Sequence, residues 1–252
     1  MLISPDAARA YLERSPDANL MLLAALAYDP VRAQVGVERG GALAAAALVV
    51  ELGDGGREER PTIMVAADDA EALGQLVRAH DWPLPAVWSV ARPDLLAELE
   101  RLLGRARSRW RGVRAYVAAS PPQVGGPAVR SITLADADAL DLAPCSLGPT
   151  ALRNWLRRGW RMFGVVQGGA LVCHALAAYP VLDTEEVSAV FTAPRWRRRG
   201  LARAVVAATI GDIVGRGRRA VYVAGRSNIA SQAVAEGLGM APLFETWEIV
   251  TG

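Results

Sequence analysis

The chain has 252 residues, of which 52% are hydrophobic and 21% are charged, and its formal net charge at pH 7 is +2. This small charge argues against a protein that binds nucleic acid over its whole surface, and no apolar run approaches the roughly 20 residues of a membrane span. The two cysteines, Cys145 and Cys173, and the two histidines show no metal-ligand spacing. We therefore expect a cytoplasmic protein without a disulfide framework, a bound metal or a membrane segment.

Hydrophobic spacing and turn residues predict alternating helices and strands in the first half of the chain. The expected helices are Pro5–Arg14, Ala18–Ala27, Asp68–His80 and Pro93–Leu103. The expected strands are Ala33–Glu38, Ala42–Leu52, Pro61–Ala66, Ala86–Ala91 and Val113–Ala118, with a polar loop at Gly53–Arg60. Residues 121–127 are rich in proline and glycine, which is typical of a linker.

The second half, from residue 128 to residue 252, shows the same alternation. The expected helices are Ala135–Leu142, Thr150–Arg158, Gly200–Gly215 and Asn228–Leu238. The expected strands are Ala128–Thr133, Met162–Gln167, Ala170–Ala178, Val187–Thr192 and Arg219–Ala224, with one or two more in Leu243–Val250. Strands that alternate with helices indicate the α/β or α+β class.

One stretch, Val187–Ala202, joins a buried strand to a helix through a proline break and an arginine-rich loop. The first turn of a helix has free N–H groups and a positive dipole end, so it attracts anions. Gly200 lets the backbone approach a ligand closely, and arginines supply forked donors suited to phosphate. The chain contains no lysine. Arginine is therefore frequent throughout, and a solvated surface is the alternative interpretation of the cluster.

Two motifs resemble the GCN5-related N-acetyltransferases, the GNAT superfamily. Arg197-x-x-Gly200-x-Ala202 is similar to the family's loop of Arg or Gln, two residues, Gly, one residue, and Gly or Ala. Downstream, Asn228 opens a helix that closes with glycine, as in the family's asparagine-led helix. Asn228 is also a good N-cap by its chemistry alone. The resemblance covers about residues 126 to 252.

The resemblance implies a mixed central sheet flanked by helices, with acetyl-CoA as the acyl donor and no metal. It also implies that the arginine loop holds the pyrophosphate and that a backbone N–H near Phe191–Thr192 donates to the thioester oxygen. The implied cofactor-binding residues are Val190, Phe191, Thr192, Arg197, Arg198, Arg199, Gly200, Leu201, Ala202, Arg203, Asn228 and Ser231.

A primary amine has a pKa near 10, so a base must remove its proton before attack. Glu185 and Glu186 start the central strand, and only one of two successive residues can point into a cleft. Glu186 lies six residues before Thr192, where the histone-modifying members of the family carry their glutamate base. Glu186 is therefore the candidate catalytic base, and a solvated pair of acids is the alternative. His174 is a second candidate, although a histidine among apolar residues is more often structural.

The chain departs from the family at the expected general acid. Many members carry a tyrosine seven residues after the asparagine, and here this position is Ala235. Tyr222, Ser227 or water could protonate the leaving thiolate. Departure could also be unassisted, because a thiol has a pKa of about 8.5.

The two halves of the chain resemble one another. When the chain is shifted by 128 positions, Val35–Val50 lies over Phe163–Ala178, and eight of the sixteen positions are identical. The same shift places Asp69–Gly74 over the arginine loop, where acids would repel pyrophosphate. We therefore expect a tandem form with a degenerate GNAT-like domain at residues 1–120 and an acetyl-CoA-binding domain at residues 128–252.

Together these observations predict an N-acyltransferase that moves an acetyl group from acetyl-CoA to a primary amine of an unknown acceptor. The expected reaction is direct attack in a ternary complex, by a monomer or homodimer with no nucleic-acid or membrane partner. The alternative is a non-catalytic acyl-CoA-binding sensor, which the missing tyrosine favours slightly. Nucleic-acid binding by the arginine loop is disfavoured, because Trp196 alone interleaves with the arginines.

Overall fold

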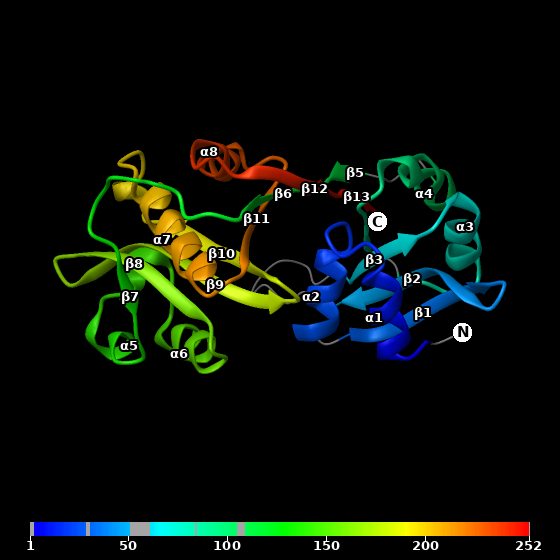
Figure 1. The fold of residues 1–252 in the computed structure, drawn as a ribbon, viewed down its shortest axis with the longest axis horizontal. Helices are drawn as coiled ribbons and strands as arrows, with labels where there is room; N and C mark the ends of the chain where they lie inside the picture. Colours follow the sequence, from blue (N-terminus) through cyan, green and yellow to red (C-terminus); the bar gives the residue numbers. More distant parts are fainter. Residues whose placement is uncertain (1–2, 29–30, 51–60, 84, 105–108, 252) are drawn as a thin grey trace. The chain divides into compact units, whose positions relative to one another are not determined.

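The computed structural model describes residues 3–28, 31–50, 61–83, 85–104 and 109–251, and the chain forms two compact units (Figure 1). The first unit comprises Met1–Arg114, Gly225–Ser227 and Leu243–Gly252, and the second comprises Ala115–Ala224 and Asn228–Pro242. The expected loop Gly53–Arg60 lies outside the described residues. No helix in the described part of the chain is long and apolar enough to cross a membrane.

In the described part of the chain, the first unit is a mixed sheet of six strands with four α-helices. Its strands lie in the order β1-β2-β3-β4-β13-β5. The strands are β1 Val31–Arg39, β2 Ala42–Val50, β3 Thr62–Ala67, β4 Val87–Val90, β5 Arg109–Arg111 and β13 Trp247–Val250. The helices are α1 Pro5–Leu12, α2 Leu20–Tyr28, α3 Ala70–Arg78 and α4 Leu96–Leu103, with a 3₁₀ turn at Pro93–Leu95.

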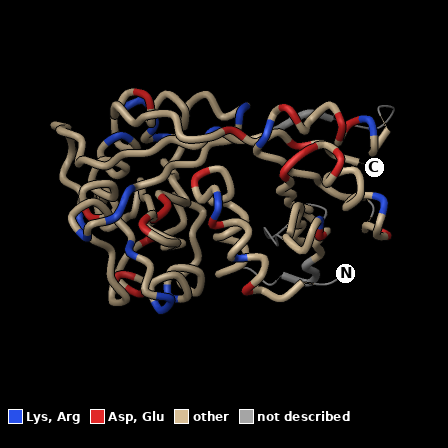
Figure 2. The backbone as a smooth tube through the Cα atoms, turned by 45° about the vertical axis from the view of Figure 1, so that its right-hand side comes forward, with Lys and Arg blue, Asp and Glu red and all other residues tan. Residues whose placement is uncertain are grey.

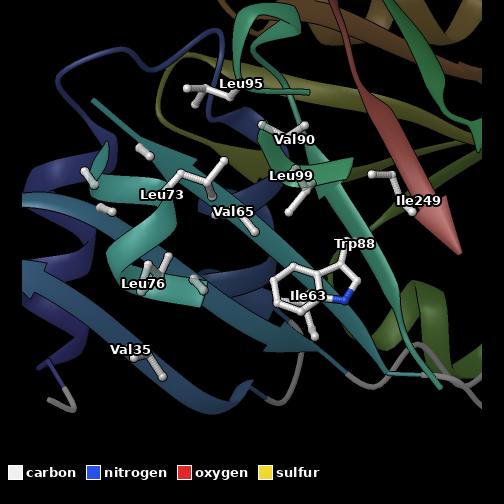
Figure 3. Packing of buried hydrophobic residues seen from close by; sticks show 14 of the residues in the cluster. Val35, Ile63, Val65, Leu73, Leu76, Trp88, Val90, Leu95, Leu99 and Ile249 are labelled. Atoms are coloured by element: carbon white, nitrogen blue, oxygen red, sulfur yellow. The ribbon is translucent and has the colours of Figure 1, made fainter. Parts of the chain in front are cut away.

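The core of the first unit lies between its sheet and the helices α3 and α4. Trp88 of β4 is fully buried there, together with Leu73 of α3 and Leu99 of α4. Figure 3 shows that Ile249 of β13 faces the same cluster. The last strand of the chain therefore helps to complete the core of the first unit.

The second unit is a mixed sheet of seven strands with four α-helices. Its strands lie in the order β12-β6-β11-β10-β9-β8-β7. The strands are β6 Val113–Ala118, β7 Arg130–Ile132, β8 Arg161–Gln167, β9 Ala170–Val181, β10 Thr184–Thr192, β11 Arg219–Gly225 and β12 Ala241–Glu245. The helices are α5 Asp136–Ala139, α6 Pro149–Arg157, α7 Leu201–Gly215 and α8 Ile229–Gly237, with 3₁₀ turns at Ala143–Cys145 and Pro194–Trp196.

Helices cover both faces of the second sheet (Figure 1). On one face, Val205 and Ile210 of α7 are fully buried against Cys173 of β9 and Val187 of β10. On the other face, Leu152 of α6 packs in a second cluster that includes residues of β8 and β9. These two layers confirm the mixed α/β class expected from the sequence.

Each sheet contains one strand that does not come from the half of the chain that builds the rest of that sheet. Residues 243–252 were expected in the second domain, but β13 lies between β4 and β5 in the first sheet. Conversely, β6 lies between β11 and β12 in the second sheet. Each half of the chain thus contributes one strand to the sheet built mainly by the other half. The short strand β5 was not predicted, and α5 is shorter than expected.

The hairpins β1–β2 and β8–β9 share two features of backbone geometry, the Gly-Gly turn and a shift of register. Gly40 and Gly41 turn with φ values of 57° and 80°, and Gly168 and Gly169 with 57° and 81°. The register shifts at Val37/Glu38 in the first hairpin and at Val165/Val166 in the second, which are 128 positions apart. These shared features support the interpretation of the chain as an internal repeat.

Close packing of a glycine against a leucine is common to both hairpins as well. A Cβ added at Gly36 would lie 2.6 Å from Leu43, and one added at Gly164 would lie 2.6 Å from Leu171. Both glycines and both leucines are separated by the same 128 positions. The identities in the sequence alignment therefore correspond to equivalent contacts in the two sheets.

Candidate functional site

A cleft opens in the second unit where β10 and β11 separate. The two strands pair in parallel from Thr184–Arg219 to Val187–Tyr222. Strand β10 then continues to Thr192, where its partner is β9. Helix α7 follows β10 through the arginine-rich loop, so its N-terminus lies at the open end of the strands. We call this site the α7 cleft.

The α7 cleft has a volume of ≈ 520 Å³, which is in the usual range for small-molecule sites. Its walls are mostly apolar, with polar groups gathered around the helix N-terminus. The lining residues are Val190, Phe191, Thr192, Trp196, Arg197, Arg198, Gly200, Leu201, Ala202, Arg203, Tyr222, Asn228, Ala230, Ser231 and Val234.

Helix α7 begins without a side-chain cap. Its N-cap residue is Gly200, which adopts a left-handed conformation with φ 75°. A Cβ at Gly200 would have no atom within 4 Å, so it would project into open space beside the cleft. The free N–H groups of the first turn therefore face a cradle that an anion could fill.

Positive charge gathers around this helix end. Figure 2 shows arginines and acids interspersed along the chain. Arg197 donates from Nε to the carbonyl of Thr192 at 3.2 Å, which holds the loop against the end of β10. Within the described residues, no carboxylate forms an ion pair with Arg197, Arg198 or Arg203. Their charge is therefore available to an anionic ligand.

Helix α8 forms the opposite wall. The side chain of Asn228 accepts a hydrogen bond from the Ser231 N–H at 3.1 Å, so Asn228 caps this helix. Tyr222 and Ser231 both line the cleft, and burial raises the pKa of the Tyr222 phenol above its usual value. Ala235 is fully buried in the same apolar cluster as Tyr222. A tyrosine thus lines the cleft from β11 rather than from α8.

The end of β10 is fixed by contacts with β9. The Thr192 hydroxyl and the Cys173 thiol lie 3.1 Å apart. Phe191 stacks on His174, with the ring centroids 6.2 Å apart. Burial raises the pKa of the Cys173 thiol to about 11, which leaves it protonated and a poor nucleophile at neutral pH.

The two glutamates at the start of β10 have different environments. Glu185 is 4% exposed, and its carboxylate accepts two hydrogen bonds from Arg216 at 2.6 and 3.0 Å. Both carboxylate oxygens of Glu185 are therefore engaged in a structural ion pair with Arg216. Glu186 lies on the other face of the strand, is partly buried, and pairs in register with Ala178 and Val221. It is not among the residues that line the α7 cleft.

His174 is unsuited to act as the base. Its side chain is 3% exposed, and burial lowers the pKa of the imidazole to about 4. A base with so low a pKa removes a proton from an alkylammonium group poorly at neutral pH. His174 also lies outside the lining of the α7 cleft.

We compared the sequence and the fold with those of known proteins. Residues 163–248, which include the α7 cleft, match the family model described as FR47-like protein. A search of the curated proteins found no match. Among solved structures, a Drosophila protein matches with a TM-score of 0.70 and 14% identity, over 100% of this chain and 98% of that chain.

Two further structures carry the superfamily in their descriptions. A GCN5-related N-acetyltransferase from Sphaerobacter thermophilus matches with a TM-score of 0.57 and 17% identity, over 83% of this chain and 76% of that chain. A tandem GNAT protein from the clavulanic acid biosynthesis pathway matches with a TM-score of 0.52 and 17% identity, over 93% and 88%. This chain has the GNAT fold. The fold that the two short motifs implied is thereby confirmed.

Within the GNAT fold, the α7 cleft brings together eleven of the twelve predicted cofactor-binding residues. The exception is Arg199, whose guanidinium lies over the ring of Trp196, 4.9 Å from its centroid. The sequence motifs missed Trp196, Ala230 and Val234. The spacing of Ala230 and Val234, one helical turn apart on the expected helix, was the available signal.

Among the described residues of the first unit, the N-terminus of the corresponding helix offers no comparable anion site. The N-terminus of α3 is capped by Asp69, whose carboxylate accepts from the Ala72 N–H at 2.8 Å. Arg39 bridges this end by binding Asp69 at 2.7 Å and Glu71 at 2.6 Å. The Ala72 N–H and the Arg39 guanidinium are therefore already paired within the protein.

Proposed function

We propose that the chain is an N-acyltransferase that moves an acetyl group from acetyl-CoA to a primary amine by direct attack in a ternary complex. The observation that carries the proposal is the uncapped N-terminus of α7, which faces the cleft beside Arg197, Arg198 and Arg203. An anionic, elongated ligand with a pyrophosphate fits this combination of free N–H groups, positive charge and apolar wall.

The residues of the chain have distinct parts in this proposal. The first turn of α7 and its arginines hold the pyrophosphate. A backbone N–H of β10 near Phe191–Thr192 donates to the thioester oxygen as the amine attacks and charge develops. The carbon–sulfur bond then breaks, and the thiolate takes up a proton. Tyr222 is the proposed donor of that proton, because it lines the cleft.

Glu186 remains the proposed base for the amine proton. Glu185 is held by Arg216, and His174 has a low pKa, so neither competes for this role. The first unit is proposed as the degenerate half of a tandem form, because Asp69 and Arg39 close the helix end that would hold a phosphate. Cytoplasmic location and a monomeric or homodimeric state stay predictions from the sequence.

The experiment is a thiol-release assay with acetyl-CoA and a panel of primary amines. We expect amine-dependent release of free thiol, and a kcat about 100-fold lower in Glu186→Gln with an unchanged KM for acetyl-CoA. Glu185→Gln is the matched control on the same strand. It breaks the ion pair with Arg216, so it lowers stability and leaves kcat near that of the wild type.

The alternative is an acyl-CoA sensor without turnover, which Ala235 at the usual tyrosine position favours. Saturable binding of acetyl-CoA with no thiol release for any amine would establish the sensor and contradict the transferase. An unchanged kcat in Glu186→Gln would move the role of base to another group.

A further inference from the structure

A small pocket lies in the first unit, at the open end of two parallel strands. Strands β3 and β4 pair in parallel from Thr62–Val87 to Val65–Val90, and β3 then continues to Ala67. Ligands often bind beside the carboxyl ends of parallel strands. The pocket has a volume of ≈ 130 Å³, and the end of α1 and the turn after it form its other wall. We call it the Asp68 pocket, because Asp68 follows β3 directly.

Asp68 is fixed in this pocket by its backbone and by one of its two carboxylate oxygens. Its N–H donates to the Ala44 carbonyl at 2.7 Å, and its own carbonyl accepts from Arg92 Nη1 at 2.6 Å. The Oδ1 atom lies 3.2 Å from the Tyr11 hydroxyl and 3.4 Å from Arg14 Nη2. Within the described chain, no hydrogen bond reaches the Oδ2 atom. The position of Asp68 is therefore set, while one oxygen stays available to a ligand.

Arg14 provides the positive charge of the pocket. Its guanidinium lies over the ring of Tyr11, 5.1 Å from the centroid, and donates from Nη1 to the Leu43 carbonyl at 3.2 Å. These contacts hold the group in place but use only some of its N–H donors. The second arginine of the pocket, Arg92, donates from Nε to the carboxylate of Asp94 at 3.1 Å and is neutralised by it. Among the described residues that line the pocket, Arg14 is thus the cation that can still bind a carboxylate.

The two available charges are opposite in sign and close together. Arg14 Nη2 and Asp68 Oδ1 are 3.4 Å apart, and the side chains are 56% and 40% exposed, so a ligand can reach both from solvent. Beside them, the buried residues Val65, Val90 and Leu95 form an apolar wall. A simple anion would be repelled by Asp68, and a simple cation by Arg14. A ligand that carries both charges satisfies both side chains with charge-assisted hydrogen bonds.

The volume of the pocket limits the size of this ligand. An apolar cavity of about 150 Å³ holds one molecule of benzene. The ≈ 130 Å³ of the Asp68 pocket therefore suit a molecule of about six non-hydrogen atoms. The α7 cleft has ≈ 520 Å³, so the Asp68 pocket is too small to be a second site for an acyl-CoA.

We propose that the Asp68 pocket binds a small α-amino acid as a zwitterion, with its ammonium group on the Asp68 carboxylate and its carboxylate on the Arg14 guanidinium. An α-amino acid carries the two charges on neighbouring groups, as the short distance between these side chains requires. The hydroxyl of Ser15, which also lines the pocket, is a further donor for the carboxylate. The proposal rests on the first unit alone and does not depend on acetyl-CoA.

Three ligands of similar size test the charge requirement with the wild-type protein. L-Alanine carries both charges, propionate lacks the ammonium group, and ethylamine lacks the carboxylate. Each is titrated into the full chain, and the backbone amide resonances of Ser15–Asn19 and Val90–Arg92 are followed by NMR. We expect saturable shifts with L-alanine at millimolar concentration or below. Propionate and ethylamine should bind at least about tenfold more weakly, because each lacks one charge-assisted interaction.

Two substitutions test the side chains assigned to the ligand. Arg14→Gln and Asp68→Asn should each raise the Kd for L-alanine about tenfold or more. Arg9→Gln is the matched control for Arg14→Gln, because Arg9 lies on α1, is 48% exposed and does not line the pocket. Asp6→Asn, in the first turn of the same helix, is the control for Asp68→Asn. Both controls should leave the Kd unchanged.

The outcomes separate a zwitterion site from an ordinary surface ion pair. Absence of saturable shifts with L-alanine would overturn the proposal. Equal affinity for propionate and L-alanine would reveal a simple anion site and overturn it as well, and so would an unchanged Kd in a folded Arg14→Gln protein. If Asp68→Asn is unstable, the ligand series and Arg14→Gln still decide, because both leave Asp68 in place. Acetyl-CoA binding is measured separately, so failure of one proposal leaves the other standing.

Discussion

At the scale of single residues, the buried imidazole of His174 makes stability depend on pH. Its pKa is about 4 in the folded protein because of burial, against 6.5 for an exposed histidine. Between these values the unfolded chain binds a proton that the folded chain does not. Stability therefore falls as the pH falls from 6.5 towards 4, and below 4 this loss is complete.

We predict that the free energy of unfolding at pH 5 is lower by about 2 kcal/mol than at pH 7.5 because of this group. Urea unfolding of the wild type and of His174→Gln at both pH values measures it, since glutamine does not titrate. Carboxylates with arginine partners, such as Asp136 beside Arg130, have a pKa below the usual range and titrate at lower pH. An identical loss of stability in His174→Gln would contradict the prediction.

Residue identity was predictable where chemistry and spacing are local. Arg197 and Gly200 lie in the loop that leads into α7, and Asn228 caps α8. Each is recognisable from its residue type and its position at a helix N-terminus. The left-handed conformation of Ala189 was not predictable, because it lies at a register shift between β9 and β10 that no sequence pattern records. The stacking of Arg199 on Trp196 was not predictable either, because Arg197 or Arg198 in the same loop could have stacked there instead.

At the scale of elements, the helices α3 and α7 follow the strands β3 and β10, which come after the two equivalent hairpins, but they begin in opposite ways. Gly200 leaves the N–H groups of α7 free, whereas Asp69 caps α3 and pairs with Arg39. This contrast is the reason why we propose a phosphate site at the end of α7 and not at the end of α3. The acids at Asp69 and Glu71 had predicted the difference from the sequence.

The contrast predicts different consequences for changes at the two helix ends. Asp69→Ala removes a cap, so we expect a lower Tm by a few degrees and an unchanged affinity for acetyl-CoA. Thermal unfolding and a ligand titration of the same sample measure both quantities. A folded Asp69→Ala protein that no longer binds acetyl-CoA would show that the end of α3 belongs to the site.

At the scale of the whole molecule, each sheet contains one strand from the other half of the chain. Strand β13 lies between β4 and β5, and β6 lies between β11 and β12. The alternation of apolar and polar residues predicted both strands but not the sheet that each one joins. Such pairing depends on which sheet edges are exposed once the sheets have folded. The domain boundary predicted at residue 120 therefore differs from the limits of the observed units.

The exchanged strands predict how the chain responds to a cut in residues 121–127. A protease site placed there leaves one fragment with β6 and the other with β13, each inserted in the other's sheet. We expect the cleaved protein to elute as a single species of the size of the intact chain, until denaturant is added. Two folded fragments that separate after cleavage would contradict the observed strand order.

The central claim is that the α7 cleft binds acetyl-CoA, and calorimetric titration of the intact protein tests it most directly. We predict saturable binding at one site, and its loss in Gly200→Glu, where the new side chain would occupy the open space at the helix N-terminus. Circular dichroism of the variant confirms that the fold is retained. No binding by the wild type at millimolar acetyl-CoA, or full binding by a folded Gly200→Glu protein, would contradict the account.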